Sequence, residues 1–235
     1  MEKARYFKFE SFATKDGDGI RGAVFFSGCP LSCVYCHNID CNFEGEEIST
    51  KELFDKLIRY KSYYKNGGIT FSGGEPLLSA KFLLEIIPML KKEGLNICID
   101  TAGVEVNEDV KKVLSITDNV LLDLKFYNQE DYKKYANGNL SLVLDFLKTA
   151  TNLVKDVRIR TVIVPNINDK IEDIKCYYNV LKQYNVKKHE LLPFHTLGFN
   201  KYEKYGKQNP LQNTKAMEIS TLKTLQNYLD NLYKG

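Results

Sequence analysis

The stretch Ala23-Val-Phe-Phe-Ser27-Gly28-Cys29-Pro-Leu-Ser-Cys33-Val-Tyr-Cys36 joins an apolar run to three closely spaced cysteines. Residues 23–27 have the aromatic and β-branched character of a buried strand. Gly28 and Pro30 then favour a turn directly after that strand. The sequence therefore predicts a loop rich in thiols at the carboxyl end of a strand.

Strand-like and helix-like runs alternate along the rest of the chain. Six strand–helix units in strict alternation predict parallel strands with right-handed crossovers, and so an α/β fold, either a doubly wound sheet or a complete or partial barrel. The predicted strands are 23–27, 69–72, 96–100, 120–125, 157–164 and 190–193. The predicted helices are 50–63, 80–93, 107–114, 142–154, 169–184 and 214–233.

Length and composition are those of a globular protein with one sizeable core. The 235 residues are 43% hydrophobic and 27% charged, and 33 basic against 30 acidic residues leave a net charge of +3. The chain lacks a basic block for nucleic acid, an apolar run of membrane-spanning length and the apolar segment of a signal peptide. We expect a single domain over residues 1–235, a cytoplasmic location and a monomer that binds neither nucleic acid nor membrane.

Polar residues gather where the predicted strands end. In a barrel every strand points one loop to the same rim, and reactive side chains collect there. Six such positions at one rim therefore predict a site: Gly28-Cys29, Gly73-Gly74-Glu75, Asp100-Thr101, Asp123-Leu124-Lys125, Pro165-Asn166 and His195.

Three of the six cysteines are spaced C-x3-C-x2-C, at Cys29, Cys33 and Cys36. A structural zinc site needs four ligands, and His37 or Cys41 could supply the fourth. A cubane iron–sulfur cluster takes one thiolate per iron, so three thiolates leave one iron open for a small chelating molecule. The spacing favours the cluster, because the other polar residues at the rim would have no role beside a structural zinc ion.

The cysteine spacing, with Tyr35 as the aromatic residue before the last cysteine, resembles the signature of the radical S-adenosylmethionine superfamily. Further strings resemble the activating enzymes of glycyl radical enzymes, and their order extends the likeness over nearly the whole chain. They are Asp16-Gly-Asp-Gly-Ile-Arg21, Phe26-Ser-Gly-Cys29, Tyr35-Cys-His-Asn38, Ser72-Gly-Gly-Glu75-Pro76, Asp100-Thr101-Ala-Gly103, Leu122-Asp-Leu-Lys125, Arg160-Thr-Val-Ile-Val-Pro165 and Leu191-Leu-Pro-Phe-His195.

The resemblance implies a partial (β/α)6 barrel of the radical S-adenosylmethionine type. It also implies reductive cleavage of S-adenosylmethionine to methionine and a 5′-deoxyadenosyl radical, which takes a hydrogen atom from a glycine of pyruvate formate-lyase in anaerobic metabolism. The implied cofactors are one [4Fe–4S] cluster with three cysteine ligands, S-adenosylmethionine and a monovalent cation, K⁺ or Na⁺. Flavodoxin or ferredoxin is the implied electron donor.

The same resemblance assigns roles to individual residues. Cys29, Cys33 and Cys36 would bind the cluster, and Lys125 and His195 would be catalytic. The residues implied for S-adenosylmethionine are Tyr35, Cys36, His37, Gly74, Asp123, Leu124, Lys125 and His195. Those implied for the monovalent cation are Asp100, Thr101, Leu121 through its carbonyl, and Asp123.

Asp16 and Arg160 are implied to line the groove for the protein substrate, with an ion pair at the barrel rim as the alternative reading. The family usually has proline at the position of Asp18, so we expect a looser turn and an added negative charge beside this groove.

Two other functions compete with this one. The first is activation of a different glycyl radical enzyme; such activases carry a ferredoxin-like insert after the cysteine triad, whereas only seven residues separate Cys41 from Ser49. The second is a non-catalytic iron–sulfur or zinc protein, which would not need Gly74, Asp123, Lys125 and His195 at one rim.

Overall fold

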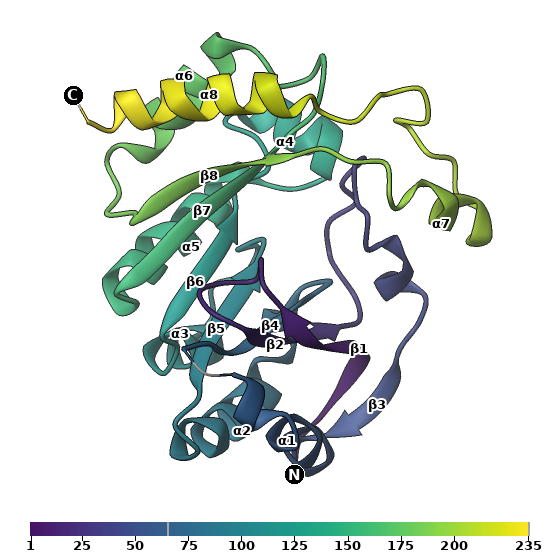
Figure 1. Ribbon diagram of the computed structural model, residues 1–235, viewed down its shortest axis with the longest axis vertical. Coiled ribbons are helices and arrows are strands. Elements are labelled where there is room, and N and C mark those ends of the chain that lie inside the picture. The colour runs from purple at the N-terminus through teal and green to yellow at the C-terminus, as the bar shows by residue number, and fades with distance from the viewer. Residues whose placement is uncertain (65, 235) are drawn as a thin grey trace.

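One eight-stranded sheet organises the chain in the computed structural model, which describes residues 1–64 and 66–234. The strand order is β3-β1-β2-β4-β5-β6-β7-β8, and the sheet curves around a central space without closing (Figure 1). The six predicted strands are present and run parallel, as a partial (β/α)6 barrel requires. They are β2 (Arg21–Phe26), β4 (Gly68–Gly73), β5 (Asn96–Thr101), β6 (Asn119–Asp123), β7 (Asp156–Ile163) and β8 (Lys188–Pro193).

Two antiparallel strands, β1 (Lys3–Ala13) and β3 (Glu46–Ser49), extend the sheet at one edge and were not predicted. The start of β1 alternates buried Ala4 and Tyr6 with exposed charged residues, the pattern of a strand with one solvated face. β3 has only four residues, and short, charged strands are common at sheet edges. Both strands are too polar to stand out as apolar runs.

Six helices correspond to the predicted ones: α1 (Thr50–Ile58), α2 (Ala80–Lys92), α3 (Glu108–Ser115), α5 (Leu140–Leu153), α6 (Ile171–Leu181) and α8 (Ile219–Leu232). α1 begins in a capping box between Ser49 and Glu52, and it ends before residue 63 because the chain tightens into a 3-10 turn. α8 begins later than predicted, at Ile219, because the Met217 amide is bonded outside the helix, to the Phe194 carbonyl at 2.9 Å.

Two further helices, α4 (Gln129–Ala136) and α7 (Phe199–Lys204), lie in segments where the sequence predicts no helix. α4 buries only Tyr132 and Ala136, so its apolar stripe is too thin for a periodicity argument. Its ends carry the available signals, since Asn128 caps the first turn and Asn137 adopts the left-handed conformation after the last.

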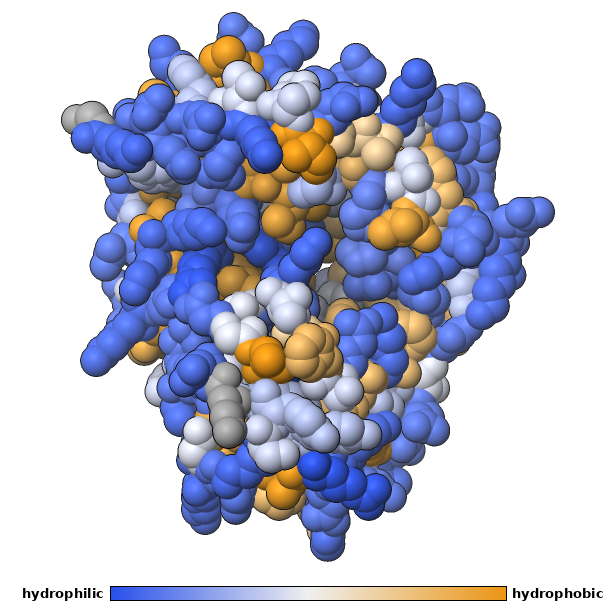
Figure 2. All heavy atoms as spheres, in the orientation of Figure 1, coloured by the Kyte–Doolittle hydropathy of each residue, from blue (hydrophilic) through white to orange (hydrophobic). Residues whose placement is uncertain are grey.

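The two faces of the sheet differ in chemistry because side chains alternate along each strand. Val24 and Phe26 point into the main core beneath the helices, whereas Ala23 and Phe25 lie on the other face in a small separate cluster. Polar side chains of β4–β7 share that inner face. Hydrophilic residues cover most of the surface seen in Figure 2, which is hollowed near its centre. Across the described ranges, no helix combines the length and apolar character needed to cross a membrane.

The free edge of the sheet at β8 is covered by one side chain of α8. Gln226 accepts a hydrogen bond from the Leu191 amide at 2.8 Å and donates one to the His189 carbonyl at 3.1 Å. The amide group thus replaces a neighbouring strand over two backbone positions. This contact fixes the last strand of the partial barrel and blocks edge-to-edge pairing there.

Candidate functional site

The three clustered cysteines lie on the loop that follows β2, with each side chain partly exposed. The loop turns tightly, since the Cys36 amide donates to the Cys33 carbonyl at 3.1 Å. Cys41 and Cys98 are instead fully buried, as expected for small apolar residues in a core.

Gly74 anchors the start of this loop through close backbone contact. A Cβ on Gly74 would lie 2.0 Å from the carbonyl oxygen of Gly28, so no side chain fits there. The amide of Glu75 donates to the same carbonyl at 2.8 Å. Gly74 therefore joins β4 to the residue before Cys29, a structural role that accounts for this glycine by itself.

The unpredicted helices α4 and α7 hold the cysteine loop from two sides. The amides of Ser32 and Val34 donate to carbonyls at the end of α4, at 3.0 and 2.9 Å. On α7, the buried Tyr202 hydroxyl donates to the Cys36 carbonyl at 3.2 Å, and Lys201 donates to the His37 carbonyl at 2.7 Å. These contacts join residues about 100 and 165 positions apart, which no local pattern could indicate.

Burial keeps the cysteine thiols protonated in the chain alone. It raises the pKa of Cys29 to about 11 and that of Cys33 to about 12, and it raises the pKa of Cys36 as well. The nearby ammonium of Lys125 acts in the opposite direction on all three pKa values. Since a ligating thiol must lose its proton, cluster binding here releases protons.

The donor set fits an iron–sulfur cluster better than a single ion. Among residues 1–64 and 66–234, no three Cys, His, Asp or Glu side chains converge closely enough to hold one metal ion. A cubane cluster does not need such convergence, because each thiolate binds a different iron. Three half-buried thiols on one braced loop meet that requirement.

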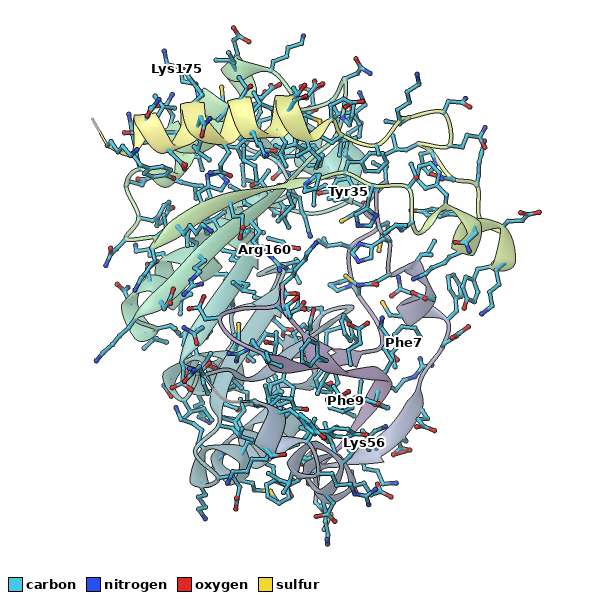
Figure 3. All side chains as sticks on the ribbon, in the orientation of Figure 1. Phe7, Phe9, Tyr35, Lys56, Arg160 and Lys175 are labelled. Atoms are coloured by element: carbon cyan, nitrogen blue, oxygen red, sulfur yellow. The ribbon has the colours of Figure 1, made fainter. Side chains whose placement is uncertain are left out.

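A charged network crosses the inner face of the sheet below the cysteine loop. Arg160 on β7 binds Asp100 on β5 and donates from Nε to Oδ1 of Asp123 on β6 at 3.0 Å. Lys125 Nζ lies 2.7 Å from the other oxygen of Asp123, and the Ser72 hydroxyl donates to Asp100 at 2.7 Å. Figure 3 labels Arg160 on these strands, near the middle of the molecule.

Two carboxylates and two cations balance one another in this network. Burial alone would raise the pKa of Asp123, but Arg160 and Lys125 lower it to about 2. Asp123 in turn counters the burial of Lys125 and holds the pKa of that ammonium well above its usual value. Lys125 is therefore a charged group, 13% exposed, whose field reaches all three cysteines.

The four residues predicted to bind a monovalent cation are only partly gathered. Asp100 and Asp123 lie on the inner face, joined by Arg160. The Thr101 side chain points to the opposite face, where its hydroxyl donates to Glu75 at 2.7 Å and accepts from the Gly103 amide at 2.9 Å. Leu121 is buried next to Asp100 in the strand pairing. A guanidinium thus already lies between the two predicted carboxylate ligands.

Leu124, predicted to contact S-adenosylmethionine, has both backbone groups occupied. Its amide donates to the Arg160 carbonyl at 3.0 Å, and its carbonyl accepts from the Thr161 hydroxyl at 3.1 Å. Its side chain is 1% exposed and packs in the main core. The structure therefore gives Leu124 the role of fixing the register of Asp123 and Lys125.

Glu75 is a buried acidic residue to which the sequence assigned no role. Its carboxylate accepts from the Leu77 amide at 3.1 Å, the Thr101 hydroxyl at 2.7 Å and the Ala102 amide at 2.8 Å. Burial raises the pKa of Glu75 to about 7. Glu75 thus ties the loop after β4 to the end of β5. In the sequence, the signal for this role was the place of Glu75 directly before Pro76. Glu75 is the N-cap of a short helix that Pro76 begins.

Two of the residues predicted to contact S-adenosylmethionine have a buried polar atom with no hydrogen-bond partner among the described residues. These atoms are the hydroxyl of Tyr35 and Nδ1 of His195. The ring of His195 lies 5.0 Å from that of His37, measured between centroids, so the rim brings together residues 158 positions apart. Because buried polar groups are nearly always hydrogen-bonded, these two atoms are suited to meet a bound molecule.

Asp16 and Arg160, the predicted groove residues, differ in setting. Arg160 is 12% exposed and belongs to the charged network, where its ion-pair partners are Asp100 and Asp123 and not Asp16. Asp16 lies half-buried on the turn between β1 and β2. Asp18 on the same turn adds no free negative charge, because both of its carboxylate oxygens bind Arg158, at 2.7 and 2.6 Å. The expected loosening of this turn is therefore opposed by an ion pair.

Comparison with known proteins defines the class. A family model described as a 4Fe-4S single cluster domain matches residues 15–142. A radical SAM methyltransferase from Sphaerobacter thermophilus superimposes with a TM-score of 0.66 at 14% identity, covering 90% of this chain and 64% of that one. SuiB of Streptococcus suis bound to S-adenosylmethionine gives a TM-score of 0.68 at 14% identity, covering 88% and 45%. The fold is that of the radical S-adenosylmethionine enzymes, with a single 4Fe–4S cluster domain.

A sequence relative narrows the class to a family. The pyruvate formate-lyase-activating enzyme of Clostridium pasteurianum is 43% identical over 237 aligned positions, which cover 99% of each chain. The chain belongs to the family of pyruvate formate-lyase-activating enzymes.

Proposed function

We propose that this protein activates pyruvate formate-lyase by generating a glycyl radical on it. The observation that carries the proposal is the position of Lys125, which links the charged network to the cysteine loop: it binds Asp123 at 2.7 Å, and its charge acts on all three thiols. A site that combines thiols with fixed charges suits a zwitterionic cofactor beside a cluster. Membership in the family supplies the protein substrate.

Cys29, Cys33 and Cys36 would hold one [4Fe–4S] cluster, and S-adenosylmethionine would bind beside it. When bound and reduced, the cluster would supply one electron for the reductive cleavage of the S–C5′ bond of S-adenosylmethionine, and the 5′-deoxyadenosyl group released would accept a hydrogen atom from a glycine Cα of the protein substrate. The protein provides ligands, orientation and exclusion of water.

Different residues of the rim would bind different parts of S-adenosylmethionine. The Lys125 ammonium, kept charged by Asp123, offers a partner to the carboxylate of the methionine moiety. Nδ1 of His195 and the hydroxyl of Tyr35 offer hydrogen bonds to its polar edge. We assign the following residues to direct contact in this site: Tyr35, Cys36, His37, Asp123, Lys125 and His195. Gly74 and Leu124 would shape the site through their backbone contacts.

A monovalent cation, K⁺ or Na⁺, would lie beside Asp100 and Asp123, with the Leu121 carbonyl as a further oxygen ligand. Thr101 would contribute its carbonyl, because its hydroxyl is bonded to Glu75 on the opposite face. Oxygen donors of this type suit such a cation. The pairing of both carboxylates with Arg160 means that a cation at this place requires Arg160 to shift. A flavodoxin or ferredoxin as reductant, a cytoplasmic location and a monomeric state complete the proposal.

The test is radical formation on the protein substrate. Anaerobically reconstituted and reduced protein, S-adenosylmethionine and pyruvate formate-lyase should together give a glycyl radical signal by EPR. Cys36→Ala should abolish that signal, whereas Cys98→Ala, which alters a buried cysteine away from the loop, should retain it. Cleavage of S-adenosylmethionine without any radical on pyruvate formate-lyase would contradict this choice of substrate.

A further inference from the structure

The turn between β1 and β2 is tied to a distant strand by a two-point ion pair. Figure 1 shows this turn reaching across the concave side of the sheet. Arg158 on β7 donates from Nη1 to Oδ1 of Asp18 at 2.7 Å and from Nη2 to Oδ2 at 2.6 Å, across 140 residues. Such parallel pairing of a guanidinium with a carboxylate fixes direction as well as distance.

Arg158 is held in place by a residue of its own strand, independently of the turn. Asp156, two residues earlier on the same face of β7, accepts from Arg158 Nε at 2.9 Å and from Nη2 at 2.6 Å. The Arg158 side chain is 20% exposed, whereas that of Asp18 is 71% exposed. The strand therefore offers a fixed guanidinium, and the turn is the partner that must come to it.

The remaining contacts of the turn hold it to its own side of the sheet, and they include a hydrogen bond from Nη1 of the buried Arg21 on β2 to the Asp18 carbonyl at 3.2 Å. The Thr70 hydroxyl donates to the Asp16 carbonyl at 2.6 Å. Gly19 has a positive φ of 73°, and a Cβ there would lie 2.0 Å from the carbonyl oxygen of Asn66. These last two are contacts to β4 and the segment before it. Among the side-chain contacts of the turn, the pair with Arg158 is the one that spans the concave side to β7.

The position of the turn sets the position of Asp16. The Asp16 carboxyl lies close enough to the charged network for its pKa to respond: burial and Asp100 raise the pKa, and Arg160 lowers it. Asp16 is two residues from Asp18, so a displacement of one moves the other. A shift of this turn would change the space above Arg160, where a chain segment must approach the inner face.

We propose that the Asp18–Arg158 ion pair positions the turn over the inner face of the sheet and thereby sets how the glycine segment of the protein substrate reaches the site. The part of this inference that concerns the glycine segment rests on the proposed function. Asp18 and Arg158 are positioning residues and take no part in the chemistry. In a relative with proline at this place, rigidity would have to come from the backbone instead.

The first test uses the protein without cofactors or substrate. Lys15 is exposed on the turn, so trypsin cleavage there and hydrogen exchange of amides 14–20 report its mobility. Asp18→Asn should accelerate both several-fold, and Asp18→Asn with Arg158→Gln should do no more than either alone. High salt should loosen the wild type toward the variant. Asp55→Asn, which breaks the exposed Lys51–Asp55 pair at 2.6 Å, is the matched control and should change neither rate.

The second test measures coupling to the substrate. Asp18→Asn should raise the KM for pyruvate formate-lyase several-fold and leave uncoupled S-adenosylmethionine cleavage within about twofold of the wild type, whereas Asp55→Asn should change neither. Unchanged cleavage and exchange at the turn would overturn the proposal, and so would a loosened turn with an unchanged KM. If the wild type gives no radical on pyruvate formate-lyase, the proposed function fails instead, and the mobility data still decide the positioning role.

Discussion

Arg160 and Asp123 form the central contact of the site, an Nε–Oδ1 hydrogen bond of 3.0 Å between neighbouring strands. Asp123 is 22% exposed and Arg160 is 12% exposed, so both ions are largely removed from water. Removal of one partner from such a pair leaves a poorly solvated charge, which costs about 3–5 kcal/mol. The network is thus sensitive to each of its members.

Asp123→Asn should therefore destabilise the protein by about 3 kcal/mol and weaken S-adenosylmethionine binding at least tenfold, because Lys125 loses its counter-ion. Cluster content should stay at the wild-type level. Urea unfolding, cofactor titration and iron analysis check the three parts. Asp55→Asn, at an exposed ion pair, should cost less than about 1 kcal/mol. Equal effects of the two substitutions would show that the network has no special role.

The cysteine triad predicts a cluster with three protein ligands. Replacing Cys29, Cys33 or Cys36 by alanine should remove the iron, whereas Cys41→Ala and Cys98→Ala should keep it, since both of those cysteines are fully buried. Iron-to-protein ratio and the EPR spectrum of the reduced protein are the measurements. Loss of iron in Cys41→Ala as complete as in Cys36→Ala would indicate four ligands and no open iron.

Asp100 and Asp123 predict a dependence on monovalent cations. Replacing K⁺ and Na⁺ by a bulky organic cation at constant ionic strength should weaken S-adenosylmethionine binding in the wild type. The same exchange should have little effect in Asp100→Ala, where one ligand is gone. A wild type indifferent to the cation would mean that Arg160 alone balances the two carboxylates.

His189 predicts a pH dependence of stability. Burial lowers its pKa to about 3, from 6.5 for an exposed imidazole, so below pH 6.5 the unfolded chain binds a proton that the folded chain excludes. The free energy of unfolding is therefore unaffected by His189 above pH 6.5. As the pH falls from 6.5 toward 3 it decreases, by about 2 kcal/mol at pH 5. His189→Gln, which keeps an N–H for Thr161, should remove this part of the slope in urea unfolding. If the free energy of unfolding of this variant depends on pH as steeply as that of the wild type, a group other than His189 takes up the proton.

Local patterns were sufficient for the parallel strands, the spacing of the three cysteines and the nearness of Lys125 to Asp123, although β6 ends at Asp123 and Lys125 lies just beyond it. They were insufficient where a contact depends on distant chain. The Thr101 hydroxyl lies on the face opposite Asp100 because adjacent residues of a strand alternate, but its partner there, Glu75, comes from 26 residues earlier in the chain. Arg160 joins carboxylates 60 and 37 residues away, so it belongs to the network as well as to the rim.

The helices that brace the cysteine loop were missed for a related reason. α4 and α7 are short and polar, and what stabilises them is their contact with the loop through groups such as Tyr202. Hydrophobic periodicity detects helices that cover a core, and these two barely do so. Such elements become visible only when the whole fold is assembled.

The transfer of one hydrogen atom tests the central claim most directly. Pyruvate formate-lyase carrying glycine deuterated at Cα should be incubated anaerobically with reduced protein and S-adenosylmethionine, and the 5′-deoxyadenosine analysed by mass spectrometry. We predict one deuterium in the 5′-deoxyadenosine and a glycyl radical signal whose doublet, present with ordinary glycine, has collapsed. 5′-Deoxyadenosine without deuterium, formed while pyruvate formate-lyase stays free of radical, would contradict the account.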